Sequence, residues 1–389
     1  MTDRSSRRRR IGVLTTGRQD WGILRSTCDA LVAMDGLEMA LMVGGMHLSE
    51  RHGHTVTDIL DAGFVPSVEM SWLDPEADPS ADVQAARALE SVARALRSSA
   101  VDAIVLAGDR IETAAAALAA TFERVPIVHV HGGEQTTGSF DDTLRHAITK
   151  FSHLHLVSHE EYRRRVIAMG EDPGTVFVIG APGLDAAHRS DLADRSELER
   201  SLGVALDPPV VLVTIQPATL DEDPVAVAAP IIEAMRRVPA TYIVTSPNTD
   251  PGGDTIRRAL TALASESPRT ILVDALGERG YWGLMRIADA MLGNSSSGII
   301  EAPAFNLPVI NVGDRQAGRR REANVIDVAA SVVAIEPALK HALDRNARAA
   351  IAASSTTTSD GLAGKRAADI IATWQPTVPP RKAPIQVDP

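Results

Sequence analysis

The chain has 389 residues, a hydrophobic fraction of 44%, a charged fraction of 23% and a formal net charge of -11. This length predicts two domains, and the composition is that of a soluble globular protein. The negative charge disfavours a nucleic-acid-binding surface, and no apolar run reaches the about 18 residues that a membrane span needs. The opening residues lack the pattern of a secretory signal, and the single cysteine, Cys28, cannot form an internal disulfide. We therefore expect a cytoplasmic protein without nucleic-acid or membrane partners.

Short apolar runs alternate with helical patterns along the chain. In the first half we expect strands at 11–15, 103–106, 126–130, 154–157 and 176–179, and helices at 83–98, 112–122 and 142–151. In the second half we expect strands at 210–214, 241–245, 270–273, 290–292, 308–312 and 331–335, and helices at 225–238 and 363–374. The runs are rich in Val, Ile and Leu without polar alternation, which is typical of strands covered on both faces. Repeated strand–helix–strand units predict parallel sheets.

A charged stretch at 189–206, followed by Asp207 and two prolines, separates the two sets of strands. The predicted parts are a disordered basic tail at 1–10, an N-terminal Rossmann-like domain at 11–190, a C-terminal Rossmann-like domain at 191–362, a C-terminal helix at 363–375 and a proline-rich tail at 376–389. The fold class is α/β, with two Rossmann-like domains that face a cleft. In such sheets ligands bind beyond the carboxyl ends of the strands, so the residues after each run are the candidate site.

Two polar motifs follow early strands of the N-terminal domain. Residues 16–22 form a turn of small residues that opens a helix, and its N–H groups together with Arg18 suit a phosphate, although an ordinary strand–helix turn is the alternative. Asp109 and Arg110 follow the strand at 103–106. They are interpreted as an acid/base group and an anion clamp, with a structural ion pair as the alternative.

The densest motif is His129-Val130-His131-Gly132-Gly133-Glu134, followed by Asp141 and Arg145. Two histidines at alternate strand positions point the same way, as metal ligands do, but no compact third ligand follows. We favour general acid/base chemistry beside a sugar ring and predict no metal site. For His129, deeper in the strand, a buried hydrogen-bonded histidine is the alternative.

The C-terminal domain carries two further motifs. Residues 293–298 read Gly-Asn-Ser-Ser-Ser-Gly, and hydroxyls with helix-terminal N–H groups suit a diphosphate, with a plain capped helix as the alternative. Glu301, one turn later, can accept both hydroxyls of a ribose. Residues 311–316 precede the basic cluster 319–321, part of which we expect to face phosphates. The loop is not GxGxxG, so no nicotinamide cofactor is predicted.

At these residues the sequence resembles the hydrolysing UDP-N-acetylglucosamine 2-epimerases, over roughly residues 11 to 375. The matching segments are 16–22, 45–49 with His54-Thr55, 108–110, 131–134, 141–150, 293–301 and 313–316. The resemblance implies a two-Rossmann glycosyltransferase-B architecture and a homodimer. It also implies that UDP is eliminated across C1 and C2 of the sugar and that water adds to the resulting glycal. The product would be free N-acetylmannosamine for sialic-acid-type sugars, formed without a metal or redox cofactor.

The resemblance assigns roles to individual residues. Asp109 and Asp141 match acid/base positions, and His131, Glu134 and Arg145 complete the expected catalytic set. The expected substrate-binding residues are Arg18, Asp20, His47, Arg110, Gln216, Asn248, Ser295, Ser296, Glu301 and Arg315. Two positions depart from the family pattern: His131 stands where many members have Glu, and Gln216 stands where the family usually has His. A glutamine can donate a hydrogen bond to phosphate but cannot carry a proton.

The leading hypothesis is therefore a hydrolysing 2-epimerase acting on a UDP-linked 2-acetamido sugar. UDP-N-acetylglucosamine is the first candidate, and a UDP-2,4-diacetamido-trideoxy sugar or GDP-N-acetylglucosamine are the others. The alternatives are a non-hydrolysing epimerase that returns a nucleotide-linked product and a glycosyltransferase on the same fold. The departures at His131 and Gln216 leave open a nucleotide-sugar-binding protein with little catalysis.

Overall fold

The computed structural model describes residues 7–73, 80–135, 141–217, 223, 225–247, 252–274, 276–354, 360–377 and 379–382. The chain divides into two compact units. The first unit comprises Met1–Ala186 and Ser359–Pro389, and the second unit comprises Ala187–Thr358. The end of the chain therefore returns to the first unit. No helix in the described ranges is long and apolar enough to cross a membrane.

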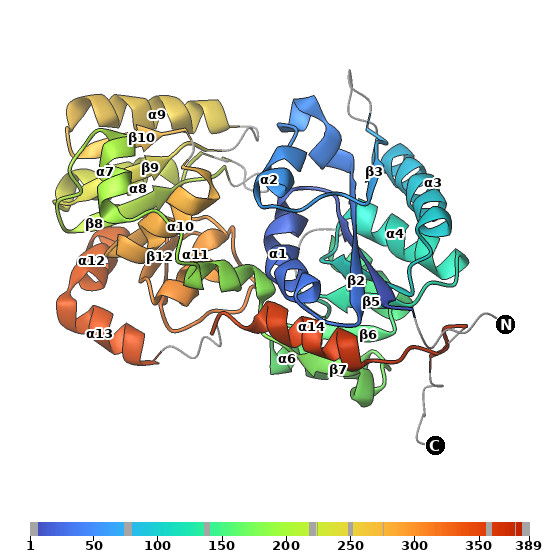
Figure 1. The fold of residues 1–389 in the computed structure, drawn as a ribbon. Helices are drawn as coiled ribbons and strands as arrows, with labels where there is room; N and C mark the ends of the chain where they lie inside the picture. Colours follow the sequence, from blue (N-terminus) through green and yellow to red (C-terminus); the bar gives the residue numbers. More distant parts are fainter. Residues whose placement is uncertain are drawn as a thin grey trace. The chain divides into compact units, whose positions relative to one another are not determined.

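The first unit is built on a parallel sheet of seven strands in the order β3-β2-β1-β4-β5-β6-β7 (Figure 1). The strands are β1 (Arg9–Thr15), β2 (Leu37–Gly44), β3 (Val68–Met70), β4 (Ala103–Ala107), β5 (Ile127–Val130), β6 (Leu154–Val157) and β7 (Val176–Val178). The helices are α1 (Arg18–Val32), α2 (Val56–Asp61), α3 (Ala81–Ser99), α4 (Ile111–Phe122), α5 (Asp141–Phe151), α6 (Glu160–Ala168) and α14 (Ala363–Thr373). Short 3-10 turns are η1 (Gly45–Leu48), η2 (Glu50–His52), η3 (Pro173–Thr175) and η4 (Pro182–His188).

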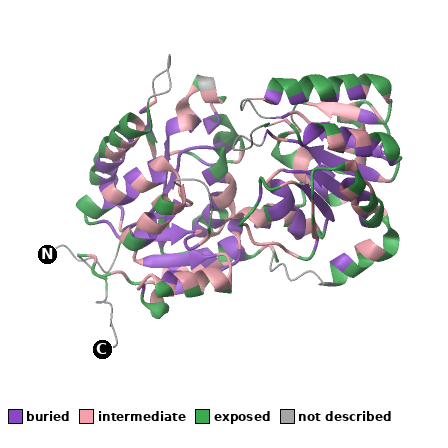
Figure 2. Ribbon diagram, turned by 180° about the vertical axis from the view of Figure 1, so that it is seen from behind, coloured by how far each residue is buried: buried purple, intermediate pink, exposed green. Residues whose placement is uncertain are grey.

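Both faces of this sheet are covered, which explains why its strands read as continuous apolar runs. One face packs against α1, α2 and α14 through side chains such as Leu24, Ile59 and Ile371. The other packs against α3, α4 and α5 through side chains such as Val92 and Ile148. Figure 2 shows the sheet as the buried layer, with the outer faces of the helices exposed.

Helix α14 is held at both ends by charged side chains from distant parts of the first unit. The Asp185 carboxylate accepts hydrogen bonds from the N–H groups of Ala363 at 3.1 Å and Gly364 at 2.7 Å. At the other end the Arg9 guanidinium donates to three main-chain carbonyls, including that of Trp374 at 2.8 Å. A negative group at the N-terminus and a positive group at the C-terminus match the helix dipole, so both contacts stabilise the docked helix. Strand β1 accordingly begins at Arg9, two residues before the predicted start.

The described part of the C-terminal tail is also tied to the first unit. The Lys382 ammonium lies 2.5 Å from the Glu171 carboxylate and donates to the main-chain oxygen of Lys150 at 2.8 Å. Glu171 is buried and receives further hydrogen bonds from Lys150 and from His155.

The second unit repeats the architecture with six parallel strands in the order β10-β9-β8-β11-β12-β13. The strands are β8 (Val210–Thr214), β9 (Thr241–Thr245), β10 (Thr270–Val273), β11 (Ala290–Gly293), β12 (Val309–Val312) and β13 (Val325–Val328). The helices are α7 (Arg195–Leu202), α8 (Ala228–Arg237), α9 (Gly253–Glu266), α10 (Gly277–Ile287), α11 (Ser297–Ile300), the 3-10 turn η5 (Ala302–Phe305), α12 (Val332–Leu343) and α13 (Arg345–Ser354). Helices α8, α9 and α12 cover one face of the sheet and α7 and α10 cover the other.

The predicted strand at 331–335 is wrong, because these residues begin helix α12. The β-branched run resembles a buried strand, but Ile335, Leu339 and Ala342 are the buried residues, and their spacing is helical. Val333 points into solvent with 86% exposure, which a strand covered on both faces would not allow. The last strand is instead β13, a half-exposed edge strand whose acidic Asp327 breaks the apolar pattern.

The prediction of two Rossmann-like domains is confirmed, since both sheets contain the strand order 3-2-1-4-5-6 when numbered within their unit, with a seventh strand added after it in the first. Two strands of the first unit, β2 and β3, were not predicted. Strand β2 contains Glu38 and two methionines, and β3 has only three residues. That the domains face a cleft stays a prediction.

Candidate functional site

The predicted motifs lie where ligands bind in this type of sheet. In the first unit the strand order reverses between β1 and β4, and in the second unit between β8 and β11. The carboxyl ends of strands at such a reversal leave room for a ligand. Residues 16–22 and 108–110 follow the first pair, and residues 214–217 and 293–298 follow the second.

The turn after β1 is organised by Asp20. Its carboxylate accepts hydrogen bonds from the N–H of Thr16 at 2.9 Å and from its hydroxyl at 2.5 Å. Asp20 is only 5% exposed, and this burial raises its pKa, opposed by hydrogen bonds from Thr16 and by the charge of Arg110. The described contacts therefore place Asp20 as the residue that shapes the turn. Arg18, at the start of α1, is largely exposed and lies 3.9 Å from Asp58.

His47 in η1 is a buried residue. Its Nε2 lies 2.9 Å from the Thr15 hydroxyl and its Nδ1 lies 2.8 Å from the Thr55 hydroxyl. Burial lowers the pKa of His47 to about 4, so the ring is neutral near pH 7. The structure thus gives His47 the role of joining β1 to the start of α2.

Arg110 is anchored beside η1. Its Nη2 donates to the Glu112 carboxylate at 3.1 Å and lies 3.2 Å from the sulfur of Met46. Glu112 is 1% exposed and also accepts a hydrogen bond from Gln84. Glu112 was not identified from the sequence. Its buried carboxylate, two residues after Arg110, holds the Arg110 guanidinium in place.

Asp109 forms an ion pair with Arg145 from α5. Burial raises the pKa of Asp109; Arg145 opposes this effect, whereas the charges of Asp141 and Glu134 add to it. Arg145 itself is 7% exposed. A partly buried carboxyl with a raised pKa and one fixed cation is suited to accepting a proton from a weak carbon acid.

His131 and Glu134 form a hydrogen-bonded dyad after β5. Nδ1 of His131 lies 2.6 Å from Oε1 of Glu134, which also accepts a hydrogen bond from the Ser158 hydroxyl at 2.8 Å. Burial favours the neutral acid, but the charges of His131 and Arg145 and the hydrogen bonds outweigh it and lower the pKa of Glu134 to about 2. The carboxylate therefore stays ionised and orients the ring, as the aspartate does in a Ser-His-Asp triad.

The backbone at His131 is strained, with φ at +66°, a value that non-glycine residues rarely adopt. Its Nε2 is buried and has no hydrogen-bond partner in the described ranges. An imidazole with one nitrogen on a carboxylate and the other unused is suited to moving a proton. Sequence reasoning missed Ser158, which follows β6, the neighbour of β5 in the sheet.

Asp141 begins helix α5, one turn before Arg145, and its charge acts on Asp109. His129 is a buried residue with a hydrogen bond at each ring nitrogen, which is the alternative considered for it. No cluster of three or more His, Cys, Asp or Glu side chains in the described part of the chain could hold a metal ion.

In the second unit a chain of hydroxyl groups follows β11. Ser295 Oγ lies 2.7 Å from Ser297 Oγ, which lies 2.8 Å from the hydroxyl of Tyr281. Ser296 precedes α11, which has only four residues, so the dipole of this helix is small. The groups that remain for an anion are the serine hydroxyls and the main-chain N–H groups of the loop.

Asn294 of the predicted 293–298 motif joins three loops of the second unit, a role that was not predicted from the sequence. Its side chain accepts from the N–H of Gln216 at 2.7 Å and donates to the carbonyl of Gln216 at 2.8 Å. The carbonyl of Asn294 accepts from Arg315 at 3.2 Å and from Gln316 at 2.9 Å. Asn294 is 1% exposed. The signal in the sequence is the preceding Gly293, whose added Cβ would lie 1.9 Å from the carbonyl of Thr214, showing how closely β8 and this loop approach.

Glu301 lies directly after α11. Burial raises its pKa to about 7, opposed by the charge of Arg319. Its Oε2 is buried without a hydrogen-bond partner in the part of the chain that the structure describes. A carboxylate with an unused oxygen is suited to accepting hydroxyl groups of a ligand. Asn248, the remaining predicted binding residue, lies outside the described residues.

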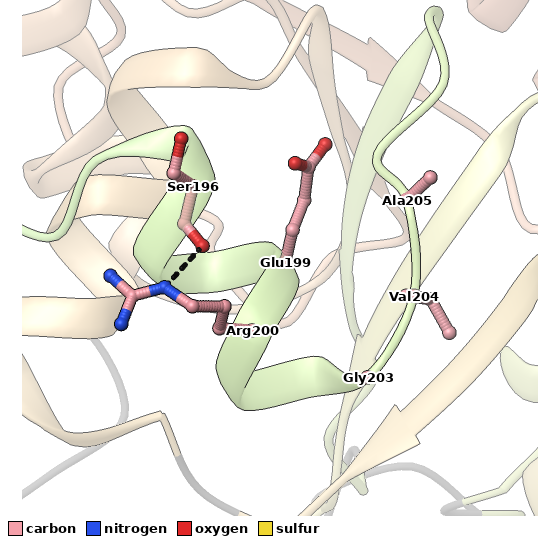
Figure 3. A pocket seen from close by; sticks show the side chains of 6 residues that line it. All are labelled: Ser196, Glu199, Arg200, Gly203, Val204 and Ala205. Carbon is pink, nitrogen blue, oxygen red and sulfur yellow. Dashed lines mark hydrogen bonds between the residues drawn. The ribbon is translucent and has the colours of Figure 1, made fainter.

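A hollow of about 450 Å³ on the second unit is lined by Ser196, Glu199, Arg200 and residues 203–205 (Figure 3). Its charged side chains are engaged locally, since Glu199 accepts from the N–H of Leu206 and Arg200 donates to the carbonyl of Ser196. None of the predicted site residues lines it.

The fold and the position of the polar loops define a class, the α/β proteins with two Rossmann-type sheets. Residues 29–372 match the family described as UDP-N-acetylglucosamine 2-epimerase. The chain therefore belongs to the UDP-N-acetylglucosamine 2-epimerase family of enzymes.

Curated relatives agree with this assignment, and a solved structure shares the fold. The chain is 35% identical over 344 residues to a UDP-N,N'-diacetylbacillosamine 2-epimerase (hydrolyzing) of Legionella pneumophila, covering 87% of this chain and 89% of the relative. It is 34% identical over 327 residues to polysialic acid biosynthesis protein P7 of Escherichia coli, covering 82% of each chain. The structure of UDP-GlcNAc 2-epimerase from Neisseria meningitidis bound to UDP-GlcNAc superposes with a TM-score of 0.75 at 16% identity, covering 93% of this chain and 99% of that one.

Proposed function

We propose that this enzyme is a hydrolysing 2-epimerase that converts a UDP-linked 2-acetamido sugar into UDP and the free C2 epimer. The observation that carries the proposal is the arrangement of proton-handling groups in the first unit. Asp109 pairs with Arg145, and the charge of Asp141 acts on Asp109. The His131–Glu134 dyad follows the adjacent strand. Epimerisation through elimination and hydration needs these kinds of group: a base for the C2 proton, an acid that returns it, and a base for water.

In the first step, the Asp109 carboxylate takes the proton from C2. The C2–H electron pair forms the C1=C2 double bond, and the C1–O bond breaks with its electrons leaving on the β-phosphate oxygen of UDP. Arg110 and Arg145 supply fixed positive charge in the first unit, which favours the developing negative charge. The raised pKa of Asp109 makes it a stronger base than an ordinary carboxylate.

In the second step, water adds to the glycal. Nε2 of His131 takes a proton from the water, and the hydroxyl bonds to C1 while C2 receives a proton from Asp141, which has taken up this proton from solvent after UDP departs. Glu134 holds the ring and stabilises the imidazolium that forms, because its own pKa is low. Removing and returning the proton with different carboxyl groups gives the opposite configuration at C2.

The second unit would bind the nucleotide. In this proposal Ser295, Ser296 and the loop N–H groups bind the diphosphate, and Glu301 accepts the ribose hydroxyls. Arg315 donates to the carbonyls of Asn294 and Pro217, so we propose that it first shapes the loop and then contributes charge to the phosphates. Gln216 would donate a hydrogen bond to phosphate without exchanging a proton.

Two sugars are the leading substrates. UDP-N-acetylglucosamine is suggested by the family description. UDP-N,N'-diacetylbacillosamine is suggested by two related proteins, from Legionella pneumophila and Campylobacter jejuni, which carry this sugar in their names and are 35% and 34% identical to the chain. GDP-linked forms complete the test set. The homodimer and the cytoplasmic location stay predictions; light scattering coupled to size-exclusion chromatography tests the first.

The decisive experiment is an NMR time course in deuterium oxide with each nucleotide sugar. We expect UDP and a free sugar with inverted C2 carrying deuterium, and Asp109→Asn should abolish both signals. A product that stays linked to UDP would establish the non-hydrolysing epimerase instead. Tight UDP binding by calorimetry with no product from any sugar would favour a binding protein and overturn the proposal.

A further inference from the structure

The buried His129 of strand β5 uses both ring nitrogens to join two other elements of the first unit. Nε2 lies 2.9 Å from the carbonyl oxygen of Gly108, and Nδ1 lies 3.2 Å from the hydroxyl of Thr149. The side chain is 0% exposed. The hydrogen bonds therefore connect the turn after β4 with helix α5 through the interior of the unit.

These two partners are next to the two members of the ion pair. Gly108 directly precedes Asp109, and its φ of +75° makes the turn that presents the carboxylate. Thr149 lies four residues after Arg145, which puts both on the same face of α5. A single imidazole thus fixes the distance between the turn that carries Asp109 and the helix that carries Arg145.

The surroundings of His129 are tightly packed. A Cβ added at Gly132 would lie 3.0 Å from Nδ1 of His129 and 3.1 Å from the hydroxyl of Thr149. A side chain at position 132 would therefore crowd both partners of the His129–Thr149 hydrogen bond, and glycine leaves the space that this contact needs.

The chemistry of the partners determines the state of the ring. A carbonyl oxygen only accepts, so Nε2 carries the hydrogen and donates to Gly108, and Nδ1 accepts the hydrogen of the Thr149 hydroxyl. Burial lowers the pKa of His129 to about 3, and the charges of His155, Arg145 and His131 act in the same direction. The ring is therefore neutral near pH 7, so it can lie near Arg145 without repelling it.

We propose that His129 is a positioning residue that holds the turn before Asp109 against helix α5 and so sets the geometry of the Asp109–Arg145 ion pair. It does not touch the sugar in this proposal. Its effect on turnover rests on the proposed function, whereas its effect on the protonation of Asp109 does not.

Two substitutions at this position separate positioning from packing. In His129→Gln the amide nitrogen replaces Nε2 and keeps the donor to Gly108. In His129→Asn the amide is shorter, reaches only the position of Nδ1 and loses that donor. Thr149→Val removes the other hydrogen bond with little change in volume. Thr27→Val is the matched control, because Thr27 is also a fully buried helix threonine of the first unit but lies on α1.

The first readout is the pKa of the Asp109 carboxyl, followed by carbon-13 NMR and assigned with Asp109→Asn. The charged groups that act on this carboxyl are Arg145, Arg110, Asp141 and Glu134. Loss of the brace weakens the contribution of Arg145, so we expect the pKa of Asp109 to rise by about one unit in His129→Asn and by less in His129→Gln. Thr149→Val should give an intermediate rise, and Thr27→Val should give none.

The second readout is the pH dependence of turnover. In His129→Asn we expect the acidic limb of the rate profile to move upward with the pKa of Asp109, and kcat to fall about tenfold with KM changed by less than about twofold. His129→Gln should recover most of the rate.

An unchanged pKa of Asp109 in both His129→Asn and Thr149→Val would overturn the inference. Equal losses of kcat in His129→Gln and His129→Asn that are explained by lower thermal stability would also overturn it. If the wild-type enzyme turns over none of the sugars, the proposed function fails, and the NMR titration still decides whether His129 positions Asp109.

Discussion

The raised pKa of Glu301 leads to a prediction in which a proposed binding residue lowers the stability of its own domain. Burial raises this pKa from its usual 4.5 to about 7. The folded state therefore holds the proton up to about pH 7, whereas the unfolded chain loses it near pH 4.5. Raising the pH through this window lowers the free energy of unfolding, because the unfolded state releases the proton more readily.

The size of the effect follows from the same two values. At about 1.4 kcal/mol for each pH unit, the ionised Glu301 destabilises the second unit by about 3 kcal/mol at pH 8. Glu301→Gln has nearly the same shape and no charge, so we expect it to be about 3 kcal/mol more stable than the wild type at pH 8 and equal to it at pH 4.5 or below. For a unit of this size the gain corresponds to a rise in Tm of roughly 6 to 12 °C.

Calorimetry of the full-length protein at several pH values between 4.5 and 8 measures this difference, and hydrogen exchange in β11 and β12 assigns it to the second unit. Glu266→Gln is the control, because this glutamate is exposed on α9 and its ion pair with Arg236 should contribute less than about 1 kcal/mol. We expect the stabilised Glu301→Gln variant to bind UDP more weakly, since an amide replaces one acceptor oxygen with a donor. A variant that is less stable than the wild type at pH 8, or a difference that does not grow with pH, would refute the burial argument.

Three further predictions concern particular contacts. Asp185→Ala removes both hydrogen bonds to the start of α14 and should destabilise the docked helix by about 1–2 kcal/mol. Hydrogen exchange and proteolysis in α14 should become faster. Unchanged protection of α14 would contradict the capping role of Asp185. Gly293→Ala places a Cβ against the carbonyl of Thr214 at a φ of +144° and should unfold or strongly destabilise the second unit, with circular dichroism and UDP calorimetry as the measurements and wild-type binding as the contrary result. Gln216→His should keep the loop conformation, because Asn294 binds only main-chain atoms of residue 216. We expect this variant to bind UDP about threefold more tightly at pH 6 and little more tightly at pH 8, where the imidazole is neutral. Equal gains in affinity at both pH values would argue against a charge contact.

The sequence by itself determined the class of fold. Unbroken runs of Val, Ile and Leu are typical of strands covered on both faces, and their alternation with helical patterns predicts parallel sheets. It also placed the polar motifs at strand ends, because a ligand in such a sheet lies beyond the carboxyl ends. Local signals failed where the period was ambiguous, as at 331–335, which is helical because Ile335 and Leu339 face the core four residues apart.

Only the tertiary structure decided which polar groups meet. Asp109 and Arg145 are 36 residues apart and pair because α5 packs against α4 and β5. Asn294 joins loops that are 78 and 22 residues from it in the chain. The return of α14 to the first unit likewise depends on Asp185 and Arg9, whose hydrogen bonds to its two ends span more than 170 residues. Periodicity and motif spacing report what one segment buries or exposes, whereas such contacts depend on how segments far apart in the chain pack, and no local pattern contains that information.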